Sequence, residues 1–325
     1  MTVKTTRFAR YAWGVLAYTI LVILWGAFVR ATGSGAGCGS HWPRCNGEII
    51  PIAPSVETMI EFSHRLTSGI ALLMVVGLFL WARRLYPKGH IVRFGAKLSL
   101  FFIILEALIG AVLVLFEWVA FYPSVERAVA VALHLVNTFV LLGIITLTAW
   151  WASGGKPFRL RNQGSLGWML GIGFVGMLLV GASGAVTALG DTLFPAGSLR
   201  EGIQQDFSPT AHFLVRLRIW HPVLAIATSV YIVAVGSVVR TLRSSRLTSR
   251  WFWTLAMLFA VQLVAGALNV WLLVPVWMQI IHLLLADFVW IVFVLLSAAA
   301  LAQTAPQPAS EALEPWPAST LEGSR

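Results

Sequence analysis

Long apolar stretches alternate with short polar ones along most of the chain. Eight of the apolar stretches reach about 20 residues or more, the length that an α-helix needs to cross a bilayer. They cover approximately residues 11–30, 59–82, 95–117, 126–151, 166–188, 216–239, 251–274 and 277–301. Stretches of this length are typical of membrane helices rather than barrel strands. The pattern therefore predicts an all-α integral membrane protein with eight transmembrane helices.

Lysine and arginine gather in alternate short loops between these stretches. They are Lys4, Arg7 and Arg10; Arg83, Arg84, Lys88, Arg93 and Lys97; Lys156, Arg159 and Arg161; and Arg240, Arg243, Arg246 and Arg250. Cytoplasmic loops carry such an excess, so both termini are predicted to be cytoplasmic. The long loops at about 31–58 and 189–215 then face outside. The first apolar stretch is longer than a signal-peptide core and no small-residue cleavage site follows it, so we interpret it as a retained span.

Composition supports the membrane assignment. The chain is 58% hydrophobic and 11% charged, with a mean hydropathy of +0.82, whereas soluble domains are about 25% charged. The net charge of +10 could indicate a nucleic-acid partner. Its distribution over alternate loops is instead explained by topology, so no nucleic-acid binding is expected.

The two halves of the chain resemble each other at an offset of about 150 residues, an even number of spans. The matching segments are Val29–Gly33 with Val180–Gly184, Glu106–Ala111 with Gln262–Ala267, and the surroundings of His64 and His134 with those of His221 and His282. An even number of spans preserves orientation, which predicts a parallel repeat of two pseudo-symmetric four-helix bundles. The predicted domains are residues 1–152 and 153–302, and residues 303–325 are predicted to be a disordered cytoplasmic tail.

Four histidines lie at matching places on the second, fourth, sixth and eighth spans, namely His64, His134, His221 and His282. We place each about 8–14 Å inside its helix from the outer end, so the four rings share one depth. Two facing imidazoles in a bundle core can ligate a haem iron, whereas zinc usually requires four N or S ligands, or three and a water. We therefore predict two haem sites, one per bundle. The alternative is that each histidine only hydrogen-bonds a neighbouring helix.

The two predicted sites differ in charge. Glu61 precedes His64 by three residues and so shares its helix face, whereas Arg218 precedes His221 by the same spacing. A carboxylate beside a reacting carbon can accept a proton or stabilise positive charge. This asymmetry favours a reaction site in the N-terminal half and an electron-handling site in the C-terminal half. The alternative is that Glu61 only pairs with Arg65.

Polar residues elsewhere suggest further contacts. Four arginines are predicted at the outer ends of spans, against the inside bias, where they could bind haem propionates or lipid phosphates; they are Arg65, Arg127, Arg216 and Arg218. For Glu106 and Asp287, which lie within spans, we expect hydrogen bonds between helices.

Both cysteines, Cys38 and Cys45, lie in the first outer loop. Disulfides persist outside the cytoplasm, so we predict a disulfide, either a structural staple or a redox-responsive bond. The chain has no C-x-x-C-H haem attachment motif.

Taken together, these segments resemble the haem A synthase family over the eight spans. The resemblance is carried by Thr32–Cys38 with Trp42, Pro43 and Cys45, by Glu61-x-x-His64-Arg65, by Leu133-His134-Leu-x-Asn137, by His212–Arg218 with His221 and Pro222, and by the His282 segment.

The resemblance implies that the C8 methyl of haem O is oxidised to a formyl group by successive hydroxylations, which gives haem A for terminal oxidases. It implies that His64 and His134 hold the substrate haem, that Glu61 is catalytic, that His221 and His282 ligate a permanent haem b iron, and that Cys38 and Cys45 are the family's first-loop pair. Some relatives carry a second cysteine pair in the later outer loop, and this chain has none there. The implied location is the cell (inner) membrane, with haem O synthase and cytochrome oxidase assembly factors as partners.

Two other classes of function remain open at this point. A di-haem b electron-transfer cytochrome that reacts with quinone would hold both haems permanently and use Glu61 only for proton movement. A transporter could also use a parallel repeat, but the ionisable groups here lie near one face rather than at the membrane midplane.

Overall fold

The computed structural model describes residues 3–159 and 161–302, and within them every regular element is a helix and no β-strand occurs. The long helices are α1 (Val3–Ala31), α2 (Val56–Leu85), α3 (Ile91–Leu115), α4 (Val125–Ala152), α5 (Ser165–Leu193), α8 (Trp220–Leu242), α9 (Arg246–Trp271) and α10 (Val276–Leu301). The short helices are η1 (Ser34–Ala36), α6 (Leu199–Asp206) and α7 (Phe213–Arg216). The predicted tail, residues 303–325, lies outside the described residues.

Eight helical segments of the described chain are long and apolar enough to cross a membrane, as predicted. Three of the long helices begin before the predicted apolar stretches, and a serine side chain caps the first turn of each. Ser55, Ser124 and Ser245 each accept a hydrogen bond from a main-chain N–H three residues later. The prediction of an all-α membrane protein with eight spans is therefore confirmed.

The sixth span differs from its prediction, because the structure divides it into two helices. The apolar stretch at 216–239 predicts one continuous helix, but the structure has α7, a turn at residues 217–219, and then α8. The proline ring of Pro222 would clash with the carbonyl of Arg218 in a continuous helix. In the structure Pro222 occupies the first turn of α8, where a missing N–H costs nothing. His221 is consequently the second residue of α8, not several residues inside a helix.

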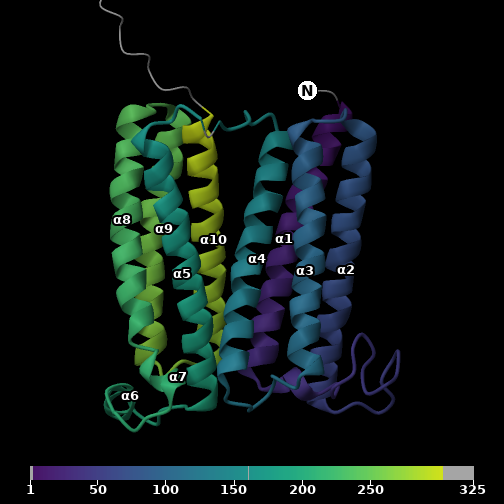
Figure 1. Cartoon of the computed structure of the whole chain (residues 1–325), viewed down its shortest axis with the longest axis vertical. Coiled ribbons are helices and arrows are strands. Elements are labelled where there is room, and N and C mark those ends of the chain that lie inside the picture. Colours follow the sequence, from purple (N-terminus) through teal and green to yellow (C-terminus); the bar gives the residue numbers. More distant parts are fainter. Residues whose placement is uncertain (1–2, 160, 303–325) are drawn as a thin grey trace, which may run out of the picture.

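The long helices form two groups that stand side by side (Figure 1). In the N-terminal group, α1–α4 contact one another in a ring, and in the C-terminal group α5, α8, α9 and α10 do the same. The groups meet chiefly through α1, α4, α5 and α10. At least half of the most apolar stretch is buried in α4 and α10, against a third or less in the other spans. These two helices form the centre, while the others expose apolar side chains as lipid-facing helices do.

Aromatic packing joins the groups at mid-height. The rings of Phe139 on α4 and Trp290 on α10 stack with centroids 5.3 Å apart. Gly181 on α5 and Gly143 on α4 permit this close approach, since a Cβ at Gly181 would lie 2.7 Å from the Phe139 ring and one at Gly143 would lie 3.2 Å from Trp290. Small residues at such positions are what allow membrane helices to pack closely.

The two ends of the molecule differ in character. α1 begins and α10 ends at one end, together with the α2–α3 and α8–α9 turns (Figure 1). The loops at residues 32–55 and 194–212 lie at the opposite end, where α6 caps the C-terminal group. We call these the basic end and the loop end, because the predicted cytoplasmic lysines and arginines flank the former.

Candidate functional site

Each of the four histidines lies against a glycine on the preceding long helix. The pairs are His64 with Gly26, His134 with Gly110, His221 with Gly184, and His282 with Gly266. A Cβ would lie 2.9 Å from the ring at Gly26, and 3.0 Å at Gly184 and at Gly266, whereas at Gly110 it would have 4.0 Å. The absence of a side chain at three of these positions therefore gives the imidazole its place.

These pairs correct one part of the predicted repeat. The sequence comparison aligns Gly33 with Gly184, but it is Gly26, two helical turns earlier, that contacts the corresponding histidine. Gly33 lies beyond the end of α1 with φ of 70° and approaches Phe121 instead. The alignment of Gly110 with Gly266 agrees with the structure. The short V-x-A-x-G similarity misled the comparison because apolar and small residues recur throughout membrane helices.

The histidines of the C-terminal group face each other. The ring centroids of His221 and His282 are 6.4 Å apart and their planes are nearly perpendicular, at 86°. A metal ion bonded to two opposed imidazoles at about 2.0–2.1 Å would hold the ring centres roughly 6 Å apart. The Oγ of Ser183 lies 3.1 Å from His221 Nδ1, which leaves Nε2 available. This pair therefore fits an axially ligated haem iron.

The histidines of the N-terminal group belong to a more polar site. His64 and His134 lie between two and three turns from the loop-end starts of α2 and α4, so the two rings share one level. The buried Nδ1 of His64 has no hydrogen-bond partner within the described part of the chain, and the Nδ1 of His134 has only the nearby Glu106 carboxylate, without an aligned hydrogen bond. The Nδ1 of His282 in the C-terminal group is likewise without a described partner. Buried ring nitrogens are normally satisfied, so these are groups that a bound ligand or a small ring adjustment would complete.

Glu106 on α3 lies beside His134 on α4 and accepts hydrogen bonds from two further residues of α4. Its Oε1 is 3.3 Å from His134 Nδ1. The carboxylate also accepts hydrogen bonds from Asn137 Nδ2 and Thr138 Oγ1. The expected hydrogen bonding between helices is thus confirmed for Glu106. At the corresponding position of the C-terminal group, Gln262 Nε2 lies 3.4 Å from His282 Nε2.

For Asp287 the same expectation is wrong. Its side chain is fully buried in α10, and neither carboxylate oxygen has a hydrogen-bond partner among the described residues. The Nε1 of Trp290, one turn along α10, is likewise without a described partner. Within the described residues, no donor from a neighbouring helix reaches the carboxylate.

Glu61 is a buried carboxylate, 3% exposed, held by the loop at residues 32–55 and by Arg65. Its Oε2 accepts a hydrogen bond from the main-chain N–H of Cys38 at 2.8 Å. Its Oε1 accepts from Arg65 Nη2 at 2.5 Å and from Nε at 3.1 Å. The Glu61–Arg65 pair weighed as an alternative is therefore present. It also has a wider role, because Arg65 Nη1 donates to the carbonyl oxygens of His41 and Arg44, each at 2.6 Å.

The loop that Glu61 contacts is closed by a disulfide between Cys38 and Cys45, as predicted. Both cysteines are buried. The main-chain N–H of Asn46 donates to the Cys38 carbonyl, and a short β-bridge joins Cys45 to Glu48. The loop is thus a compact unit whose backbone reaches the candidate catalytic carboxylate.

The other arginines named as propionate contacts have different surroundings. Arg127 is buried and donates to the carbonyl oxygens of Ala120 and Tyr122 at 2.6 and 3.0 Å. Arg216 is exposed at the C-terminal end of α7.

Arg218 forms ion pairs with Asp191 at 2.9 Å and Asp206 at 3.0 Å. Partial burial raises the pKa of Asp206 above its usual range, and the Arg218 guanidinium opposes that rise. These ion pairs fasten α6 to the end of the C-terminal group.

Arg30 is a half-buried residue that the sequence analysis overlooked. Its guanidinium donates to Ala188 O at 2.7 Å, to Thr192 Oγ1 at 2.8 Å and to Gln279 Oε1 at 2.8 Å. It therefore ties α1 of the N-terminal group to α5 and α10 of the C-terminal group. The available signal was a basic residue at the outer end of a span, against the inside bias.

Comparison with known proteins places these features in a family. A profile of the COX15-CtaA family, described as cytochrome oxidase assembly protein, matches residues 9–294. A Thermus thermophilus protein named protoheme IX farnesyltransferase is 58% identical over 296 residues, which are 91% of this chain and 49% of that protein.

Proteins named heme A synthase match at lower identity. The one from Halalkalibacterium halodurans is 37% identical over 42% of this chain and 44% of its own length. The one from an Exiguobacterium species is 31% identical over 53% of this chain and 55% of its own length. The chain spans about half the length of the curated relatives that it matches. The family match, in contrast, covers all eight spans at least in part, and the chain belongs to the COX15-CtaA family of cytochrome oxidase assembly proteins.

Proposed function

We propose that this chain is a haem A synthase that oxidises the C8 methyl of haem O to a formyl group by successive hydroxylations. Membership of the COX15-CtaA family and similarity to proteins named heme A synthase support this function. The observation that carries the proposal is the difference between the two histidine pairs. Glu61 and Glu106 accompany the pair in the N-terminal group, whereas Arg218 and Gln262 occupy the corresponding positions in the C-terminal group.

The name of the Thermus relative supports haem O as substrate and a haem O synthase as partner. That name describes the attachment of a farnesyl group to protohaem IX, and haem O is a farnesylated protohaem. A polypeptide named for this activity contains a segment that is 58% identical to this chain. An enzyme that consumes a farnesylated haem would gain from lying beside one that makes it, because the substrate is apolar and confined to the membrane.

In this proposal His64 and His134 hold the substrate haem. Glu106 would fix the orientation of the His134 ring by accepting a hydrogen bond from Nδ1, so that Nε2 is presented to the iron. Carboxylates commonly play this part beside metal-bound histidines and make the ligand more basic. Gln262 lies at Nε2 of His282 rather than at Nδ1, so it would not support that ring as Glu106 supports His134. The two sites would therefore differ in ligand chemistry as well as in nearby charge.

Glu61 is the proposed catalytic residue. Both oxygens of its carboxylate are held, one by the main-chain N–H of Cys38 and the other by the Arg65 guanidinium, so the carboxylate has a fixed position. A carboxylate fixed in this way can accept a proton from a hydroxylated carbon or stabilise positive charge that develops on the porphyrin periphery. The closed outer loop would also keep water away from the reacting carbon.

His221 and His282 are the proposed ligands of a permanent haem b. When bound, that haem supplies one-electron redox chemistry. Ser183 holds the His221 ring through Nδ1, and Gly184 and Gly266 leave room for the two imidazoles. The ion pairs of Arg218 with Asp191 and Asp206 close the loop end of this group.

We also propose that the two helix groups are pseudo-symmetric domains, residues 1–152 and 153–302, related by an axis along the membrane normal. The repeated histidine–glycine contacts on corresponding helices support this relationship. The basic end is proposed to face the cytoplasm and the loop end the outside of the cell (inner) membrane. The excess of lysine and arginine at one end and a disulfide at the other both support this orientation.

The decisive experiment is to express the chain in a host that makes haem O but not haem A, and to identify the extracted haems by mass spectrometry. Haem A, or a hydroxylated haem O, supports the proposal. A purified protein that carries two protohaems and leaves haem O unchanged would instead support the di-haem electron-transfer cytochrome. Loss of haem b absorption on His221→Ala or His282→Ala would test the second site separately.

A further inference from the structure

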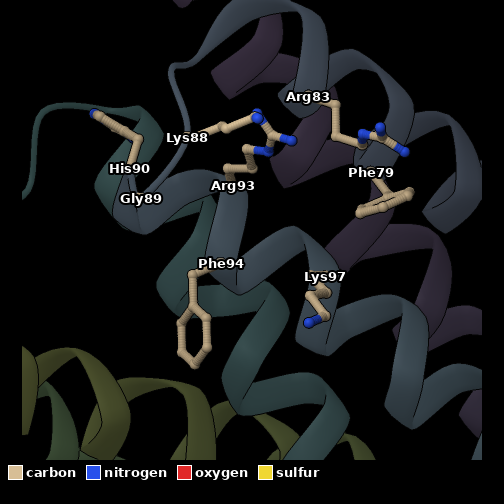
Figure 2. A pocket seen from close by; sticks show the side chains of 8 residues that line it. All are labelled: Phe79, Arg83, Lys88, Gly89, His90, Arg93, Phe94 and Lys97. Atoms are coloured by element: carbon tan, nitrogen blue, oxygen red, sulfur yellow. The ribbon is translucent and has the colours of Figure 1, made fainter.

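A hollow lies at the basic end, between the last turns of α2 and the first turns of α3 (Figure 2). Its volume is about 320 Å³. The residues that matter for its chemistry are Phe79 and Arg83 on α2, Lys88 in the turn, and Arg93, Phe94 and Lys97 on α3. It is far from the candidate haem sites, which lie toward the loop end.

Four basic side chains line this hollow and no carboxylate does. Arg83, Lys88, Arg93 and Lys97 make no ion pair or side-chain hydrogen bond within the described residues, although Arg83 lies over the Phe79 ring at 5.5 Å. The described carboxylates lie at the loop end or inside spans. His90 also borders the hollow, but its Nδ1 accepts a hydrogen bond from the Val92 N–H and caps α3. The hollow is therefore a concave surface of uncompensated positive charge.

Membrane topology alone does not explain this arrangement. The α8–α9 turn at the same end also carries cations, but two of its arginines are engaged by the protein, while Arg246 and Arg250 are exposed. Arg240 lies over Phe252 and Trp253 at 5.2 and 5.1 Å. Arg243 is buried, and its Nη2 donates to Gln163 at 3.0 Å. The inside bias requires positive charge in both turns, yet of these two described turns only α2–α3 leaves its cations around an open hollow.

The position and lining of the hollow indicate a phosphate-bearing ligand. It lies at the ends of two spans, where phospholipid head groups meet the protein, and basic pockets between membrane helices can bind anionic head groups. The rings of Phe79 and Phe94 offer apolar contact to the glycerol and upper acyl carbons. Ligand pockets are usually about 300–1,000 Å³, so the hollow admits a head group but not a whole lipid.

We propose that this hollow binds the phosphate head group of an anionic glycerophospholipid from the cytoplasmic leaflet. Arg93 and Lys97, one turn apart on α3, would contact the phosphate oxygens from one side. Arg83 and Lys88 would do so from the other side. The acyl chains would lie along the exposed apolar faces of α2 and α3. The proposal does not depend on the haem chemistry.

The test uses the purified full-length chain in detergent and native mass spectrometry with phosphatidylglycerol or phosphatidylcholine added. We expect phosphatidylglycerol to bind more tightly than phosphatidylcholine. Each cation near the surface contributes about fivefold to affinity for an anionic lipid, so Arg93→Gln with Lys97→Gln should weaken phosphatidylglycerol binding by roughly 25-fold. The matched control is Arg246→Gln with Arg250→Gln, which removes the same charge from the α8–α9 turn and should change binding little.

Three results would overturn the proposal. The first is equal binding of the two lipids by the unaltered chain, and the second is an equal loss of binding in both double variants. The third is that inorganic phosphate displaces bound phosphatidylglycerol at a concentration as low as that at which added phosphatidylglycerol does. The last result would identify a site for the free anion. Lys88→Gln, in the turn outside the helices, is a further variant in case the α3 double variant does not fold. A weakening of about fivefold is expected for it, and no weakening would count against the site.

Discussion

The carboxylate of Glu61 accepts a hydrogen bond from the main-chain N–H of Cys38 at 2.8 Å. The candidate catalytic group is therefore bonded to the residue that begins the disulfide loop. This relationship makes the outer loop part of the site, because any change in the backbone at Cys38 would move or release the carboxylate.

Replacing Glu61 with Gln should abolish haem A formation while haem b is retained. The amide is nearly isosteric, but it carries no negative charge and cannot accept a proton, so a loss of about 100-fold or more in rate is expected. Haem extraction and mass spectrometry would show haem O or a hydroxylated intermediate. Glu57→Gln, an exposed position one turn earlier on α2, is the control. Normal haem A output from the Glu61 variant would refute its catalytic role.

Replacing both Cys38 and Cys45 with Ser should loosen the outer loop and lower activity. A disulfide that closes a loop of this length contributes about 2–3 kcal/mol. Its loss would weaken the bond that positions Glu61. Hydrogen exchange of residues 32–55 should rise together with the fall in haem A output. Unchanged exchange with lost activity would favour a redox role for the disulfide over a structural one.

Replacing Glu106 with Gln should make the two histidine pairs more alike. The first pair would lose the acceptor that orients His134, and the affinity for the substrate haem or the rate should fall by about 10- to 100-fold. The iron–histidine vibration of the ferrous haem in the N-terminal group should shift to lower frequency. Gln262→Glu on α9 is the matched control, because Gln262 lies at Nε2 of His282 in the other helix group, and it should leave this vibration unchanged. No shift in the Glu106 variant would contradict the proposed role.

Replacing Gly184 or Gly266 with Ala should reduce haem b content. A Cβ at either position would lie 3.0 Å from an imidazole carbon and would displace the ring. Overpacking of this kind costs about 1–3 kcal/mol, or roughly 5- to 150-fold in haem affinity. Gly171→Ala on α5 is the control, because nothing lies within 4 Å of its Cβ position. Equal haem b absorption in all three variants would argue against the assignment of His221 and His282.

Replacing Arg30 with Gln should weaken the contact between the two helix groups. The shorter amide cannot reach all of Ala188, Thr192 and Gln279, which would leave partly buried acceptors without donors, at a cost of up to about 1 kcal/mol each. The midpoint of thermal unfolding in detergent should fall. Arg159→Gln, at an exposed position of the α4–α5 loop, should leave it unchanged. A midpoint that is also unchanged for the Arg30 variant would show that the groups are held by apolar packing alone.

Much of the fold follows from local composition. A bilayer requires stretches of about 20 apolar residues with their backbone satisfied within the helix, so the number and approximate places of the eight spans are visible in the chain itself. The break before α8 is less visible. It depends on how one proline ring meets the carbonyl of Arg218, and hydropathy averages over such a detail.

The candidate site is divided in the same way. The sequence alone identifies the four histidines and Glu61, because ionisable groups within spans are costly. It also identifies the two cysteines, which are the only ones in the chain. It does not show the role of Arg30 or the isolation of Asp287. The surroundings of Arg30 and of Asp287 depend on which side chains the neighbouring helices present at the same height. That depends on how the helices pack, which the sequence of one segment does not show.

By itself, the amino-acid sequence determined the class of protein, the spans, the excess of cations at one end and the candidate haem ligands. The tertiary structure alone decided that the Cys38 N–H donates a hydrogen bond to Glu61 and that the Glu106 carboxylate lies beside His134. It also decided which glycines leave room for the imidazole rings. The physical reason is range. Hydropathy and charge bias are summed over many residues of one segment, whereas a hydrogen bond or a ring contact is decided within about 3–4 Å by segments that meet only after the helices pack.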